Sequence, residues 1–179
     1  MTRGAQVCQS ADMAATAAAT RDGEPRIHMV GIGALKIAAA PEKLRTVLGS
    51  CVGIVLFDVH LRIAGLAHSI LPQGSEEIEE LGKFADQAVD NLVVRLTALG
   101  ASKTRLRAKL VGGAAMFETA NNGAQLGQRN VEAARRRFQA HEIPIIAEAV
   151  GGTKGRKVRV HPDTGNVEVA IIGSEPVII

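Results

Sequence analysis

The chain has 179 residues, of which 46% are hydrophobic and 22% are charged, with a formal net charge of +3. This length and balance indicate one globular domain with its own core and argue against disorder over most of the chain. Aromatic residues make up only 2% and the basic residues are spread out, which argues against nucleic-acid binding by base stacking or through a basic patch.

Residues 1–25 are rich in Ala, Thr and Gly and have no apolar face to bury, so we expect a flexible tail there and one domain over residues 26–179. No apolar run is long enough to span a membrane and no secretory signal pattern is present, so we expect a cytoplasmic protein. The two cysteines, Cys8 and Cys51, are expected to be free thiols in that reducing compartment.

The first half of the domain is predicted to be mostly β-structure. Apolar residues roughly alternate over residues 27–38, which predicts a first strand. Residues 51–70 contain two apolar runs joined by the polar stretch "DVHLR", and this pattern predicts a hairpin.

Two helices and further strands are predicted after Pro72. The first helix has Ser75 as a candidate cap, apolar residues at helical spacing and Gly100 as its end. The second helix covers residues 130–142, with Asn130 as its N-cap.

Strands are predicted at "RLRAKLVGG" and "IPIIAEAV", and the stretch "RKVRVHPDTGNVEVAII" predicts a hairpin that turns at residues 162–165. This element order predicts an α/β (α+β) layered sandwich, with a mixed sheet and two long amphipathic helices.

Cys51 and His68 stand near opposite ends of the first hairpin. If Val59 and His60 form a two-residue loop, Cys51 lies directly opposite His68. A register shifted by one, which places Cys51 opposite Ser69, and a bulge next to a glycine remain alternatives.

A thiol beside an imidazole has the chemistry of a nucleophile. Such a pair can exchange a proton to give a thiolate beside an imidazolium. The thiol of the pair therefore ionises at lower pH than an ordinary thiol. Gly49 allows backbone N–H groups to approach a reacting carbonyl, so the set suits acyl transfer. The alternative is a small buried thiol and a core histidine without catalytic roles. The other histidines are scattered and lack the spacing of a zinc site.

Six motifs, in order, go beyond these general patterns: "LGSCVGIVLFD", "GLAHSILP", "KFADQAVDNLV", "KLVGGAAMF", "GQRNVEAARR" and "AEAVGGTKGRKVRVHPDTGNVEV". Their order and spacing resemble the CheD family of chemoreceptor glutamine deamidases. The resemblance implies a sandwich related to bacterial toxin deamidases and a site with Cys51 as nucleophile, His68 as base and Thr46 as the third member. For Thr46 the alternative is a β-branched strand residue without a catalytic role.

The resemblance also implies a function and partners. It implies deamidation of glutamines on the cytoplasmic domains of methyl-accepting chemoreceptors, hydrolysis of glutamate methyl esters on the same receptors, and no cofactor. Contact with the membrane would then occur only through the receptors. Family members also pair with a CheC-type phosphatase, so the alternative function is a non-catalytic regulatory partner. A thiol redox protein is disfavoured, because no second cysteine is near Cys51 in the sequence.

Two glycine motifs, "VGGAAMF" and "VGGTKGR", have two interpretations. Glycine permits close backbone approach, so these motifs either shape the wall of a substrate cleft or make turns that only folding requires. We favour the turns.

Overall fold

The strands form two mixed sheets that pack face to face. The computed structural model describes residues 24–74, 80–115, 123–171 and 173–179, so the predicted tail falls outside the described residues except for its last two positions. Sheet A has the strand order β1 (Ile27–Met29), β3 (Lys43–Leu48), β8 (Arg156–His161), β9 (Asn166–Ile171) and β10 (Val177–Ile178). Sheet B has the order β2 (Leu35–Ala39), β5 (Ile63–Ser69), β4 (Val52–Asp58), β6 (Arg107–Gly112) and β7 (Ile145–Val150).

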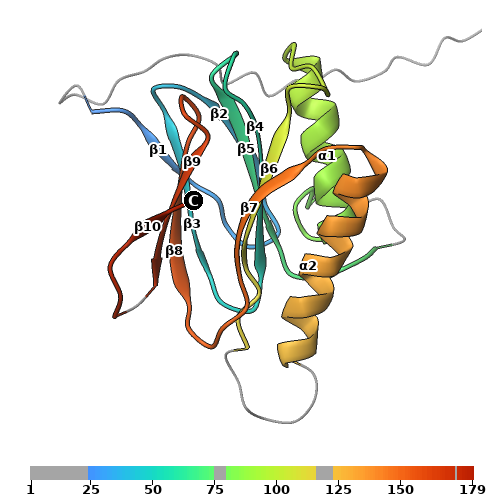
Figure 1. Ribbon diagram of the computed structural model, residues 1–179, viewed down its shortest axis with the longest axis vertical. Helices are drawn as coiled ribbons and strands as arrows, with labels where there is room; N and C mark the ends of the chain where they lie inside the picture. Colours follow the sequence, from blue (N-terminus) through green and yellow to red (C-terminus); the bar gives the residue numbers. More distant parts are fainter. Residues whose placement is uncertain (1–23, 75–79, 116–122, 172) are drawn as a thin grey trace, which may run out of the picture.

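Two helices, α1 (Ala85–Ala98) and α2 (Gly123–Ala140), lie side by side on the outer face of sheet B, so the molecule has three layers (Figure 1). One apolar cluster, which includes Leu92, Leu96 and Phe138, fills the space between sheet B and the helices. A second cluster lies between the two sheets and includes Leu44 and Leu66. The predicted layered α+β sandwich with two long helices is confirmed, and the structure adds that its strands divide into two sheets.

Strands β4 and β5 are buried along their whole length, because sheet A covers one face and the helices cover the other. Burial on both faces explains why these segments read as nearly continuous apolar runs in the sequence. Among the described residues, neither helix is long and apolar enough to cross a membrane.

The single strand predicted at residues 27–38 is wrong, because this stretch forms two strands in different sheets. β1 pairs in parallel with β3 in sheet A, whereas β2 pairs antiparallel with β5 in sheet B. A turn separates them, in which the N–H of Ala34 donates to the carbonyl of Gly31 and Gly33 has a φ of +73°. A positive φ costs glycine little, and this lets the chain cross from one sheet to the other.

Both predicted helix starts differ from the structure. α1 begins at Ala85 after Phe84, which makes no side-chain cap, and Ser75 lies outside the described residues. α2 begins at Gly123, so Asn130 is inside the helix and is not its N-cap. The buried Asn130 side chain instead donates to the carbonyl of Ile70, 2.9 Å away. The predicted end of the first helix at Gly100 is confirmed, with a φ of +95° and its N–H donating to Thr97.

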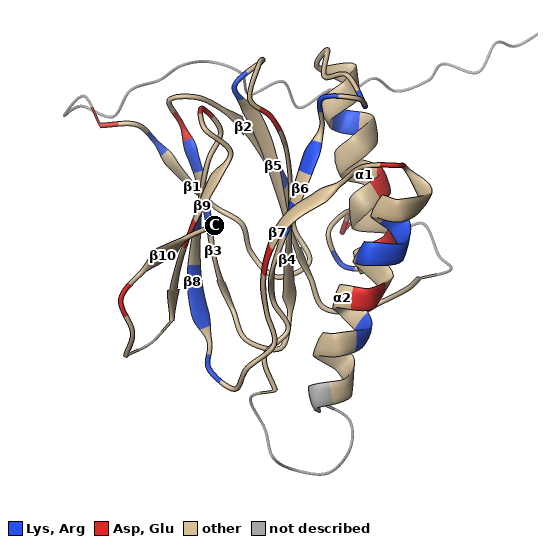
Figure 2. Cartoon of the chain, in the orientation of Figure 1, with Lys and Arg blue, Asp and Glu red and all other residues tan. Residues whose placement is uncertain are grey.

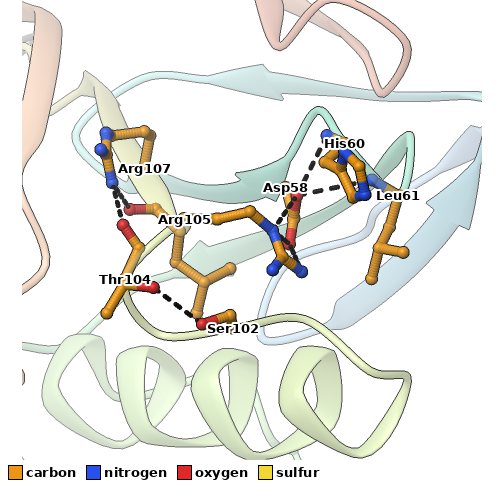
Figure 3. Close-up of polar contacts among 8 residues, drawn as sticks. Asp58, His60, Leu61, Ser102, Thr104, Arg105 and Arg107 are labelled. Atoms are coloured by element: carbon orange, nitrogen blue, oxygen red, sulfur yellow. Dashed lines mark hydrogen bonds and ion pairs between the residues drawn. The ribbon is translucent and has the colours of Figure 1, made fainter.

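The first hairpin exists, but its register differs from both predicted ones. Asp58 pairs with Ile63 across a four-residue turn, which places His68 opposite Gly53. The cause is the buried carboxylate of Asp58, which accepts from the N–H groups of His60 and Leu61 at 3.0 and 3.4 Å (Figure 3). These two bonds favour a longer turn over the predicted two-residue loop.

Arg105 completes this arrangement with an ion pair of 2.9 Å to Asp58 (Figure 3). Burial by itself raises the pKa of Asp58, but hydrogen bonds and the positive charge of Arg105 outweigh it, so the pKa lies below its usual value. The turn therefore depends on a residue 47 positions away in the sequence.

Candidate active site

Thr46 and His68 meet between the two sheets. Thr46 is on β3 of sheet A and His68 is on β5 of sheet B, and their side chains are only 2% and 3% exposed. The Thr46 hydroxyl oxygen lies 2.9 Å from Nδ1 of His68. Two of the three residues predicted for the site are therefore in direct contact, although they come from different sheets.

The hydrogen bonds of Thr46 assign the proton on His68. The Thr46 hydroxyl donates to the carbonyl oxygen of Val30 at 2.8 Å, and a hydroxyl has only one proton to donate. Towards His68 it therefore acts as an acceptor, so Nδ1 carries the hydrogen. In a neutral imidazole this leaves Nε2 unprotonated and able to accept a proton.

Cys51 lies in a bend between β3 and β4 and is half-buried. It packs against the apolar cluster between the sheets, which is the layer where Thr46 and His68 meet. Because Gly53 lies opposite His68, Cys51 comes two positions before the residue that faces the imidazole. Cys51 is therefore diagonal to His68, not opposite it as predicted. Within the described residues no hydrogen bond joins the two side chains.

Burial affects the protonation of both Cys51 and His68. Burial raises the pKa of the Cys51 thiol, and the residue's own N–H opposes this only in part. Burial lowers the pKa of His68, against a smaller opposite effect of the Val30 carbonyl. Both shifts favour the neutral forms. Burial therefore favours a thiol and a neutral imidazole over the thiolate–imidazolium pair expected from the sequence.

Backbone hydrogen bonds hold the bend at residues 49–51, which we call the Cys51 loop. The carbonyl of Cys51 accepts from the N–H of Gly113 at 2.8 Å, and the carbonyl of Gly49 accepts from Ala114 at 2.9 Å. Among the described residues, the N–H groups of Gly49 and Ser50 have no backbone acceptor. Two carbonyls of the loop are therefore occupied, while the amides of Gly49 and Ser50 are not used in backbone hydrogen bonds within the described part of the chain.

Gly112 permits this contact with the Cys51 loop. A Cβ atom at Gly112 would lie 2.4 Å from the carbonyl oxygen of Cys51, and its φ is +106°. Only glycine fits this position without displacing the loop. The "VGG" of the first glycine motif thus lies at the end of β6, where Gly112 and Gly113 both have positive φ and the backbone packs against Cys51.

Sequence reasoning missed one group in the site, the carbonyl of Val30. It orients Thr46, but a backbone carbonyl has no signal in the sequence. Within the part of the chain that the structure describes, no three His, Cys, Asp or Glu side chains are grouped to hold a metal ion.

Comparisons with known proteins identify what the chain resembles. The family model described as "CheD chemotactic sensory transduction" matches residues 70–171. A Halalkalibacterium halodurans protein named chemoreceptor glutamine deamidase CheD is 41% identical over 149 residues, which cover 80% of this chain and 92% of that protein. A Symbiobacterium thermophilum protein named probable chemoreceptor glutamine deamidase CheD is 41% identical over 155 residues, covering 83% and 94%.

A solved structure also matches, though weakly. The hypothetical protein YfiH of Bacillus licheniformis aligns with a TM-score of 0.44 and 14% identity, over 73% of this chain and 60% of that chain. A likeness at this level carries no argument about function.

Proposed function

This chain belongs to the CheD family, and from that premise we propose that it deamidates specific glutamine side chains of chemoreceptors, with Cys51 as the nucleophile and His68 as the base. The observation that carries the proposal is the contact of Thr46 with Nδ1 of His68, which leaves Nε2 free as a base in the layer that Cys51 packs against. We propose that it acts in the cytoplasm, on the cytoplasmic domains of the receptors.

In the first half of the reaction Cys51 becomes acylated. The sulfur attacks the carboxamide carbon while Nε2 of His68 takes the thiol proton, so the thiolate forms only during attack. The amides of Gly49 and Ser50 donate to the oxyanion of the tetrahedral intermediate. The C–N bond then breaks, the proton on Nε2 passes to the leaving nitrogen, and ammonia departs.

In the second half the thioester is hydrolysed. His68, neutral again, takes a proton from water, and the hydroxide attacks the thioester carbon. The C–S bond breaks, the sulfur regains its proton from His68, and glutamate is released. The raised pKa of Cys51 favours this last step, because it favours a protonated thiol once the product has formed.

The same acyl chemistry extends to a glutamate methyl ester, with methanol as the leaving group in place of ammonia. We include this esterase activity in the proposal. The alternative, a non-catalytic partner of a CheC-type phosphatase, predicts no chemical change in a receptor.

The test is mass analysis of a chemoreceptor cytoplasmic fragment after incubation with the protein. We expect the mass gain that accompanies replacement of an amide NH2 by OH, located by peptide mapping to individual glutamines. Cys51→Ala and His68→Ala should each reduce the rate by about 10³-fold or more, because a nucleophile and its base act as a unit.

The matched control is Ser69→Ala. Ser69 is next to His68 in β5 and fully buried, but its hydroxyl has no hydrogen-bond partner in the described structure, so its loss should leave the rate unchanged. An unmodified receptor with the wild-type protein, or normal turnover by either the Cys51 or the His68 variant, would contradict the proposal.

A further inference from the structure

Arg156 is a buried cation near the Cys51 loop that the proposed mechanism does not use. It is the first residue of β8, is 4% exposed and lies opposite Leu48, the last residue before the Cys51 loop. Its guanidinium reaches from sheet A to sheet B, where it donates to the carbonyls of Ala149 and Gly151.

The surroundings of Arg156 do not compensate its charge. Within the described residues it has no carboxylate partner, and its Nε is buried without any acceptor. Burial of a guanidinium that is only partly hydrogen-bonded destabilises the fold relative to an apolar side chain of similar size. The gain from an arginine here is its rigid fork, which can hold two carbonyls in a fixed relation.

The segment whose carbonyls Arg156 holds is linked to the Cys51 loop by backbone hydrogen bonds. The N–H of Gly151 donates to the carbonyl of Gly112 at 2.8 Å. Gly113, which follows Gly112, donates its own N–H to the carbonyl of Cys51. Ala115 in turn donates to the carbonyl of Gly152 at 2.8 Å. The segment 112–115 is therefore bound on one side to the Cys51 loop and on the other to the segment that Arg156 holds.

These contacts close a ring that includes the Cys51 loop. The ring runs from Leu48 through the Cys51 loop to segment 112–115, on to Gly151, and through the Arg156 side chain back to β8, where Arg156 again faces Leu48. The Arg156 guanidinium is the only side-chain link in this ring; the other links are backbone. We propose that Arg156 is a positioning residue, which holds the Cys51 loop in the geometry for attack without touching the substrate.

The role in catalysis rests on the proposed function, so the test includes readouts that do not depend on it. The central variant is Arg156→Lys, because an ammonium on a flexible stem keeps the charge but lacks the rigid planar fork that fixes two carbonyls relative to each other. The matched control is Arg159→Lys. Arg159 is on the same strand but on the outer face of sheet A, where it pairs with Glu168 at 3.2 Å.

In the deamidation assay we expect Arg156→Lys to lower kcat roughly 10- to 100-fold, since small displacements of reacting groups have effects of this size. KM should stay within about twofold of wild type, because the receptor contacts are unchanged. Arg159→Lys should change neither constant. A raised KM with normal kcat would identify Arg156 as a substrate contact, and equal effects in both lysine variants would identify a general loss of stability. Either result would overturn the proposal.

Alkylation of Cys51 by iodoacetamide gives a readout without a receptor. A loosened loop exposes the thiol, so the rate in Arg156→Lys should exceed that in wild type, while Arg159→Lys should match wild type. If the wild-type protein does not modify the receptor but this pattern appears, the proposed function fails and the positioning of the loop stands. Identical alkylation rates in all three proteins would overturn the positioning role.

A measurement on the wild type keeps the proposal testable if Arg156→Lys does not fold. The ring predicts that the amides of Gly113, Ala114 and Gly151 are protected from hydrogen exchange as strongly as the strands they adjoin. Exchange of these amides at the rate of an open loop would exclude a closed ring and overturn the proposal.

Discussion

Two buried cations, Lys109 and Arg156, bridge the two sheets towards opposite ends of the sandwich, and both donate to backbone carbonyls. Lys109 reaches from sheet B to the carbonyls of Gly165 and Ile179 at 2.8 and 2.7 Å, whereas Arg156 reaches from sheet A to sheet B. Figure 2 shows Lys and Arg in blue on β6 and β8, the two strands that carry these cations.

The difference between the two cations is what their carbonyls are attached to. The carbonyls at Lys109 belong to the turn between β8 and β9 and to the last residue of the sequence, where no proposed catalytic group lies. The carbonyls at Arg156 belong to a segment that backbone hydrogen bonds link to the Cys51 loop. The same physical contact therefore contributes to the fold at one end and, in our proposal, to catalysis at the other.

Of Thr46, Asp58 and Lys109, we expect the largest effect on kcat at Thr46, which belongs to the side of the comparison that holds the proposed catalytic groups. Thr46→Val removes the hydroxyl that orients His68, and kcat should fall roughly 10- to 100-fold, as is typical when the partner that fixes a histidine tautomer is lost. Thr46→Ser keeps the hydroxyl and should restore most of the rate. Steady-state kinetics and melting curves of both variants provide the measurement. Equal rates for the valine and serine variants would show that the hydroxyl does not act through His68.

A smaller effect, on stability alone, is expected at Asp58 in the turn of the first hairpin. Asp58→Asn weakens the contact with Arg105 and should lower the free energy of unfolding by about 2 kcal/mol, a usual value for a hydrogen bond to a charged group. Deamidase activity at a temperature where the variant is folded should be unchanged. A large loss of kcat in the folded variant would show that the end of the sandwich away from the Cys51 loop also contributes to catalysis.

This stabilisation should depend on pH with a defined sign. The folded pKa of Asp58 lies below its usual value of 3.8, so the stabilisation is present above that value and is lost as pH falls through the folded pKa. In urea unfolding, the difference between wild type and Asp58→Asn should therefore be constant near neutral pH and shrink in acid.

The smallest effect is expected at Lys109. Burial lowers the pKa of Lys109, so the folded state disfavours the charged form, and the stability from this residue should rise as pH rises towards the usual lysine value. Lys109→Met should remove this dependence of stability on pH. The substitution also removes a buried charge, which is destabilising, and two hydrogen bonds, which are stabilising, so these two effects oppose each other at neutral pH. Melting temperatures of both proteins between neutral and alkaline pH test this, with kcat as the control. A parallel pH dependence in the two proteins would contradict the expected effect of burial.

The sequence by itself determined much of the local structure. The hairpin strands, the turn at residues 162–165 and the end of the first helix at Gly100 were all predicted from residues close to one another in the chain. The family and the candidate residues Thr46, Cys51 and His68 also followed from the order of the motifs. The strands, the turn and the helix end depend on backbone preferences within short windows of the sequence, whereas the family followed from several motifs taken together along the chain.

Only the tertiary structure decided the register of the first hairpin, the proton on His68 and the support of the Cys51 loop. The register depends on the contact of Asp58 with Arg105. The tautomer of His68 depends on the carbonyl of Val30, which accepts the hydrogen of the Thr46 hydroxyl. Burial between the two sheets also favours the neutral forms of Cys51 and His68. Each of these is set by groups that folding brings together from distant positions, and a contact between two distant residues leaves no periodic pattern in the sequence.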